Sequence, residues 1–80
     1  MESLKELVAR VLGVDKSTLN DQSSPENTEN WDSFNALILV SELEENFSVN
    51  FSIEDVVAVK NFADIKKALK RHGVKNGIND

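Results

Sequence analysis

Apolar residues recur at helical spacing near the start of the chain, and this spacing constrains the fold more than any other feature. The stripe on one helical face consists of Leu4, Leu7, Val8, Val11 and Leu12. Ser3 and Glu6 have the spacing of a capping box, and Gly13 is a typical helix terminator. No segment shows the alternation of apolar and polar residues that is typical of a strand, so the sequence predicts an all-α fold.

A second helix is predicted from near Asp32 to about Asn46. Its core-facing residues are spaced alternately by four and three, and two leucines widen the same face: Ala36, Val40, Leu43 and Phe47, with Leu37 and Leu39. Asp32 is the better candidate for the N-cap, because its side chain can accept a hydrogen bond from a backbone N–H group of the first turn. This choice places Ser33 in the first helical turn.

The remaining segments complete a helical pattern. Residues 20–30 are polar, contain the only proline and predict a long loop between the first two helices. Val49 and Phe51 anchor an extended connector, after which Ser52 caps a short helix. The last helix begins at Asn61 and ends in a basic turn before Gly73. Its inward residues are predicted to be Phe62, Ile65, Ala68 and Leu69.

Eighty residues allow one domain, 1–80, with a single core. We predict a small four-helix bundle with three main helices and a short third one. The core is expected to span about residues 3–73, with Val14 and Leu19 packing back onto it. Residues 74–80 are expected to form a flexible tail, and the protein is expected to be a monomer.

The net charge of −5 argues against nucleic acid as a partner, because phosphate backbones attract Lys and Arg. Acidic residues dominate up to Asp55, whereas basic residues cluster near the end: Lys66, Lys67, Lys70, Arg71 and Lys75. An acidic middle segment is steered toward basic surfaces on other proteins. A small DNA-binding domain that uses the basic last helix is therefore a distant alternative.

The chain contains no cysteine, which fits a cytoplasmic protein and excludes thiolate chemistry. Its start carries charges throughout, so we expect neither a signal peptide nor a membrane association. His72 is the only histidine and lies in a basic turn, and the segment around Asp15 and Asp21 lacks the glycine and glutamate of a calcium loop. We therefore expect no metal site, and no enzymatic activity, because a serine nucleophile needs a nearby base.

Ser33 has two possible roles. An Asp-Ser pair at a helix start is ordinary capping chemistry. However, a phosphate ester on a serine in the first turn would lie against free backbone N–H groups and the positive end of the helix dipole. Both roles fit the residues around it.

The chain resembles the acyl carrier proteins over about residues 3–73. The resemblance rests on Asp32-Ser33-Phe34, close to the family's Asp-Ser-Leu, on "LVSELEENF" and on "NFADIKKAL". It implies that Ser33 receives 4′-phosphopantetheine from coenzyme A, delivered by a phosphopantetheinyl transferase that uses magnesium. Asp32 would help to hold that metal during the transfer, and Phe47 would be a core aromatic.

The resemblance also implies a docking surface for enzymes that transfer or build acyl groups and carry basic patches. Glu44 and Glu45 match acidic positions that meet such patches, and Glu42 belongs to the same acidic stretch. Phe34 and Ile38 are further expected contacts. Trp31, beside the attachment site, would either pack over the loop or form part of a partner's footprint.

The chain departs from the family's pattern in two places, one at the turn before Ser33 and one on the second helix. Asn30 stands where the family usually has glycine, and asparagine tolerates the left-handed backbone that such a turn needs. Asn35 and Ile38 stand where fatty-acid carriers are often acidic, which favours more apolar docking and a specialised fatty-acid, polyketide or lipid pathway. The Asp-Ser-Phe triplet is also similar to that of D-alanyl carrier proteins.

The implied function is transport of an acyl group as a thioester on the prosthetic arm. The bundle would shelter the acyl chain with apolar side chains such as Leu37, Val40, Ile53, Val56 and Val57, for which plain core packing is the alternative role. An unmodified acidic adaptor that only binds a protein partner is the alternative function.

Overall fold

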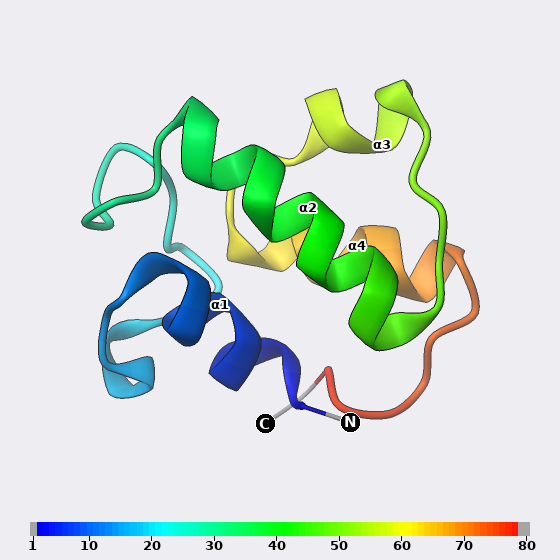
Figure 1. Ribbon diagram of the computed structural model, residues 1–80, viewed down its shortest axis with the longest axis horizontal. Coiled ribbons are helices and arrows are strands. Elements are labelled where there is room, and N and C mark those ends of the chain that lie inside the picture. The colour runs from blue at the N-terminus through cyan, green and yellow to red at the C-terminus, as the bar shows by residue number, and fades with distance from the viewer. Residues whose placement is uncertain (1, 79–80) are drawn as a thin grey trace.

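The computed structural model describes residues 2–78, and it is all-α over this range, as predicted (Figure 1). Its elements are α1 (Leu4–Leu12), the 3-10 turn η1 (Lys16–Thr18), α2 (Ser33–Phe47), α3 (Ile53–Ala58) and α4 (Phe62–Arg71). Three longer helices and the short α3 confirm the predicted architecture. The turn η1 was not predicted. No helix in the described range is long and apolar enough to cross a membrane.

The first helix begins and ends where the sequence indicates. The Ser3 hydroxyl accepts a hydrogen bond from the Glu6 N–H group, and the Glu6 carboxylate accepts one from the Ser3 N–H group. Gly13 ends the helix in the left-handed conformation, with φ of 69°. Four of the five predicted stripe residues are buried, and Val11 packs against the core with partial exposure.

The second helix starts at Ser33, with Asp32 as its N-cap, and ends one residue later than predicted. Its buried residues are Leu39, Leu43 and Phe47. The prediction that Leu37 widens the core face is wrong, because this side chain is 68% exposed. Leu37 and Leu39 are two positions apart, and about 100° of rotation per residue places them on opposite sides of a helix. Ala36 and Val40 are half-buried.

The last two helices match their predicted caps. Ser52 and Asp55 form a capping box at the start of α3, and the Asn61 side chain accepts a hydrogen bond from the Asp64 N–H group at the start of α4. The four residues predicted to face inward from α4 are all buried. These caps are local interactions, which explains why residue types alone indicate them.

The long loop between α1 and α2 is tied to α4 and to the core. The Phe62 N–H group donates to the Ser23 carbonyl at 2.8 Å, and Lys66 contacts the Asp21 carboxylate at 2.7 Å. Leu19 is buried in the core, and Val14 packs against it, as predicted. The loop therefore has a fixed path to the start of α2.

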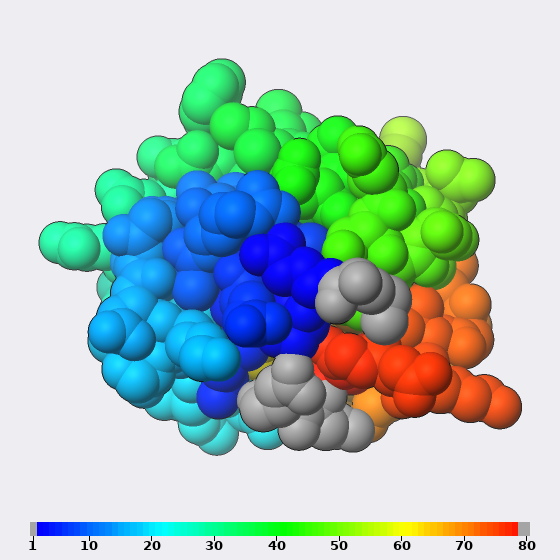
Figure 2. Space-filling view, turned by 60° about the horizontal axis from the view of Figure 1, so that its bottom comes forward, coloured from blue at the N-terminus to red at the C-terminus, as the bar shows by residue number. Residues whose placement is uncertain are grey.

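The core extends beyond the predicted limit at residue 73. Ile78 is 2% exposed and belongs to the core, and the Leu4 N–H group donates to the Gly77 carbonyl at 2.6 Å. Figure 2 shows the C-terminal segment (red) beside the N-terminal segment (blue). The flexibility expected of residues 74–80 stays a prediction, and residues 79–80 lie outside the described range.

Candidate functional site

Ser33 is the first residue of α2, and it is exposed. The turn that leads to it depends on Asn30, which has the left-handed φ of 66° that its asparagine was expected to tolerate. The Asn30 side-chain amide donates to the Leu12 carbonyl at 2.7 Å, which fixes the turn to the end of α1. The hydrogen bond from Asn30 thus holds the turn that places Ser33 at the start of α2.

Asn35 makes further hydrogen bonds at this turn, which the sequence did not indicate. Its side-chain amide donates to the Asn30 carbonyl at 2.7 Å, and its backbone N–H group donates to the Asp32 carboxylate at 2.8 Å. In the sequence, Asn35 stood out only as a departure from an acidic position. The structure shows that this amide joins the turn to the first helical turn.

The start of α2 favours a negatively charged group at Ser33. Helix geometry leaves the N–H groups of the first turn without intrahelical acceptors, and the helix dipole places partial positive charge there. One of these donors, the Asn35 N–H group, already donates to the Asp32 carboxylate. An exposed hydroxyl at this position can therefore carry a phosphodiester at low electrostatic cost.

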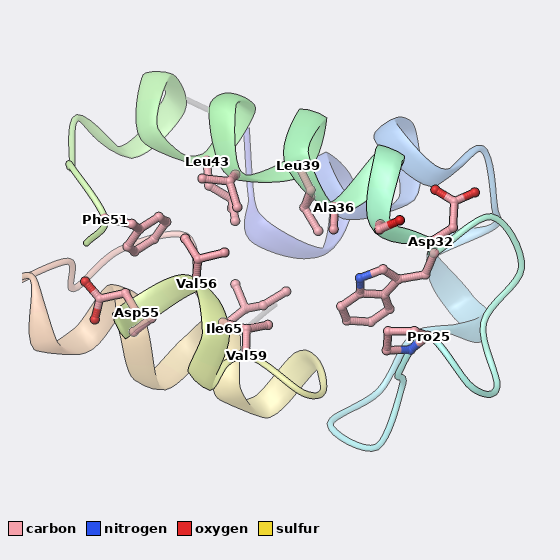
Figure 3. A pocket seen from close by; sticks show the side chains of 14 residues that line it. Pro25, Asp32, Ala36, Leu39, Leu43, Phe51, Asp55, Val56, Val59 and Ile65 are labelled. Atoms are coloured by element: carbon pink, nitrogen blue, oxygen red, sulfur yellow. The ribbon is translucent and has the colours of Figure 1, made fainter. Parts of the chain in front are cut away.

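An apolar cavity of about 330 Å³ lies next to Ser33. Its walls come from α2, α3 and α4, and from Pro25, Trp31 and Phe51 in the loops. Figure 3 shows Asp32 and Pro25 at one end and Phe51 and Asp55 at the other, with Leu39 and Leu43 between them. Because Ser33 is exposed and also lines the cavity, the cavity reaches the surface beside this residue.

Only some of the residues predicted to shelter the acyl chain line the cavity. Val40 and Val56 line it. Leu37, Ile53 and Val57 do not, and each is more than 60% exposed, so their assignment to the shelter is wrong. Together with Phe34 and Ile38 they are the large apolar side chains exposed within the described range, and we use the name apolar surface for this set: Phe34, Leu37, Ile38, Ile53 and Val57.

The three glutamates of α2 have different surroundings. Glu42 accepts a hydrogen bond from Arg10 at 2.8 Å, and Glu44 accepts one from the Phe51 N–H group at 2.7 Å. Glu45 is exposed. Two of the carboxylates thus have hydrogen-bond partners within this chain.

Trp31 is 5% exposed and lines the cavity. This burial favours the first of its two predicted roles, packing over the loop, because a buried ring offers little surface to a partner. No group of three potential metal ligands occurs among the described residues.

Comparison with known proteins identifies the family. The sequence model of the family described as "Phosphopantetheine attachment site" matches residues 2–69. Two relatives from Brachyspira hyodysenteriae, one of them from strain WA1, are named "Acyl carrier protein". Each is 33% identical over 73 residues, which cover 90% of this chain and 94% of the relative.

The match extends from the first helix into the last one, and so includes the start of α2 and the cavity. Members of this family are carriers, not catalysts, and work with a phosphopantetheinyl transferase and with enzymes that handle acyl groups. The chain belongs to the phosphopantetheine-binding carrier proteins and is similar to the acyl carrier proteins.

Proposed function

We propose that Ser33 carries the phosphopantetheine arm and that the cavity beside it shelters an acyl group. The observation that supports this proposal is the position of one hydroxyl group. It is exposed, begins α2 and lies where an apolar cavity reaches the surface. When bound, the arm supplies a terminal thiol that holds its cargo as a thioester.

The residues at the start of α2 would position the phosphodiester. The free N–H groups of the first turn would stabilise its negative charge. Asp32 is exposed, and one of its carboxylate oxygens is held by the Asn35 N–H group. The carboxylate would thus be presented in a fixed orientation to the metal ion of the transferase.

The lining of the cavity favours an acyl cargo over an aminoacyl one. Apart from Asp32, Ser33 and Asp55 at its ends, the lining residues are apolar. An ammonium group placed between Leu39 and Val56 would lose its hydration without gaining a polar partner there. An alkyl chain would instead gain from leaving water.

The apolar surface would serve docking. Phe34, Leu37 and Ile38 follow Ser33 on α2, and all three are exposed. A partner enzyme would cover them with an apolar contact and meet Glu45 with a basic residue at the edge. Docking of this kind favours a specialised fatty-acid, polyketide or lipid pathway.

The test is modification in vitro. The apo protein is mixed with coenzyme A, magnesium and a broad-specificity phosphopantetheinyl transferase, and its intact mass is measured. We expect addition of one phosphopantetheine, abolished in Ser33→Ala. Ser41→Ala is the matched control, because Ser41 is an exposed serine later in the same helix, and it should be modified like the wild type. Absence of modification with several transferases would support the unmodified adaptor instead.

A further inference from the structure

A group of interacting side chains from three segments lies at the end of the cavity opposite Asp32. Asp55 of α3 and Phe51 of the preceding connector line this end (Figure 3). Arg71 at the end of α4 donates to one Asp55 oxygen at 2.9 Å, and the Nε2 atom of His72 lies 2.8 Å from the other. We call Phe51, Asp55, Arg71 and His72 the Asp55 clasp.

The Asp55 carboxylate is held as a charged group. It also accepts hydrogen bonds from Ser52, and its side chain is only 13% exposed. The hydrogen bond with His72, followed by those with Ser52 and Arg71, holds the pKa of Asp55 far below its usual range. An alkyl chain that reached this carboxylate would have to displace its hydrogen-bond partners and leave a buried charge unpaired, which is costly.

Phe51 is the aromatic member of the Asp55 clasp. Its ring meets the His72 ring edge-to-face, with centroids 5.3 Å apart, and its backbone N–H group donates to the Glu44 carboxylate. The ring is therefore in contact with His72 at the end of α4, and the backbone of Phe51 is held by Glu44 of α2. Neither Arg71 nor His72 lines the cavity. Arg71 contacts the lining residue Asp55, and His72 contacts both Asp55 and Phe51.

We propose that the Asp55 clasp is the end-stop of the cavity and sets the longest alkyl chain that the protein shelters. This inference rests on the proposed function, because it assumes that cargo enters from Ser33. If a methylene group takes up the liquid volume of a water molecule, roughly 30 Å³, the cavity of about 330 Å³ holds on the order of ten methylene groups. Longer chains must leave part of their length in water.

The test uses the whole protein loaded at Ser33 with arms that carry saturated acyl groups, in a series of lengths on either side of about ten carbons. Intact mass confirms loading, and the thermal midpoint is measured for each length. A sheltered chain binds only the folded state and so raises the midpoint. We expect the midpoint to rise with length up to about ten carbons and then to level off.

Two kinds of variant should change, in opposite directions, the acyl length at which the thermal midpoint levels off. In His72→Ala and Arg71→Ala the clasp loses a contact that holds Asp55, and the midpoint should continue to rise beyond the length at which it levels off in the wild type. In Phe51→Trp the larger ring should make it level off at a shorter length. Lys70→Ala is the control, since Lys70 is an exposed residue of the same helix, and it should behave like the wild type. Circular dichroism checks that each variant is folded.

The outcomes separate this inference from the proposed function. The variants could instead lose the same stability at every chain length and level off at the same length as the wild type. That result would overturn the end-stop and leave the clasp as a structural contact. A midpoint that does not depend on length in any loaded protein would overturn sheltering as well. Failure to load any protein at Ser33 would instead reject the attachment site itself.

Discussion

The setting of Ser33 is made by its neighbours. Asn30 supplies the left-handed turn, and its side chain fastens that turn to the Leu12 carbonyl. Asn35 then joins Asn30 to the start of α2. The hydroxyl group thus owes its position to two asparagines, although neither of them is expected to touch the phosphodiester.

Asn30 is expected to contribute in two ways that substitution can separate. Asn30→Ala loses the side-chain hydrogen bond and also strains the backbone at positive φ, so the free energy of unfolding should fall by roughly 1–3 kcal/mol. Asn30→Gly loses only the hydrogen bond and should be less destabilised, because glycine adopts this conformation freely. Chemical denaturation measures both values. Equal losses in the two variants would show that the backbone conformation contributes nothing.

At the scale of elements, α2 has two functional sides. Leu39 and Leu43 pack into the core and line the cavity, whereas Phe34, Leu37 and Ile38 are exposed. A helix that only had to stabilise the bundle would not need three large apolar residues in water. Their exposure beside Ser33 is what makes α2 the expected docking helix.

Docking is therefore expected to depend on apolar contact more than on charge. Leu37→Ser should raise the Kd for the transferase about tenfold, equivalent to about 1.4 kcal/mol, with little salt dependence. Glu45→Lys should have a smaller effect that is larger at low salt than at high salt. Titration calorimetry at two salt concentrations tests both, with Ser41→Ala as the control. A larger effect of Glu45→Lys at both salt concentrations would contradict the apolar surface.

The helices could be predicted because their signals are local. Asp32 and Asn61 cap their helices through contacts within three residues, and such spacings are visible in the sequence. Counting helical rotation shows that Leu37 and Leu39 cannot both face the core, but it does not indicate which of the two is exposed. The role of Glu44 could not, because its partner is the Phe51 N–H group, beyond the end of its own helix. The Asp55 clasp likewise joins residues that lie far apart in sequence.

At the scale of the whole molecule, contacts between distant segments hold the small core together. Ile78 packs into the core beside the first helix, and Glu2 exchanges hydrogen bonds with Asn46 near the end of α2. The loop between α1 and α2 is held in turn by α4. A domain of this size buries a limited apolar area, so each such contact contributes noticeably to its stability.

Ile78 is expected to be part of the folded unit despite its place near the chain end. Ile78→Ala should lower the free energy of unfolding by roughly 2–5 kcal/mol, as for other fully buried isoleucines. Val57→Ala, on the exposed apolar surface, should change it by less than about 0.5 kcal/mol. Urea denaturation measures the free energy of unfolding of both variants. A negligible loss in Ile78→Ala would mean that the tail does not contribute to the core in solution.

The proposed carrier function depends most on the attachment of the arm to Ser33. The most direct measurement is peptide mass spectrometry of the protein purified from its own host under conditions in which its pathway is active. We expect phosphopantetheine on the peptide that contains Ser33 and on no other. A protein that is always unmodified at Ser33 in that host, or that carries the arm on a different residue, would contradict the account.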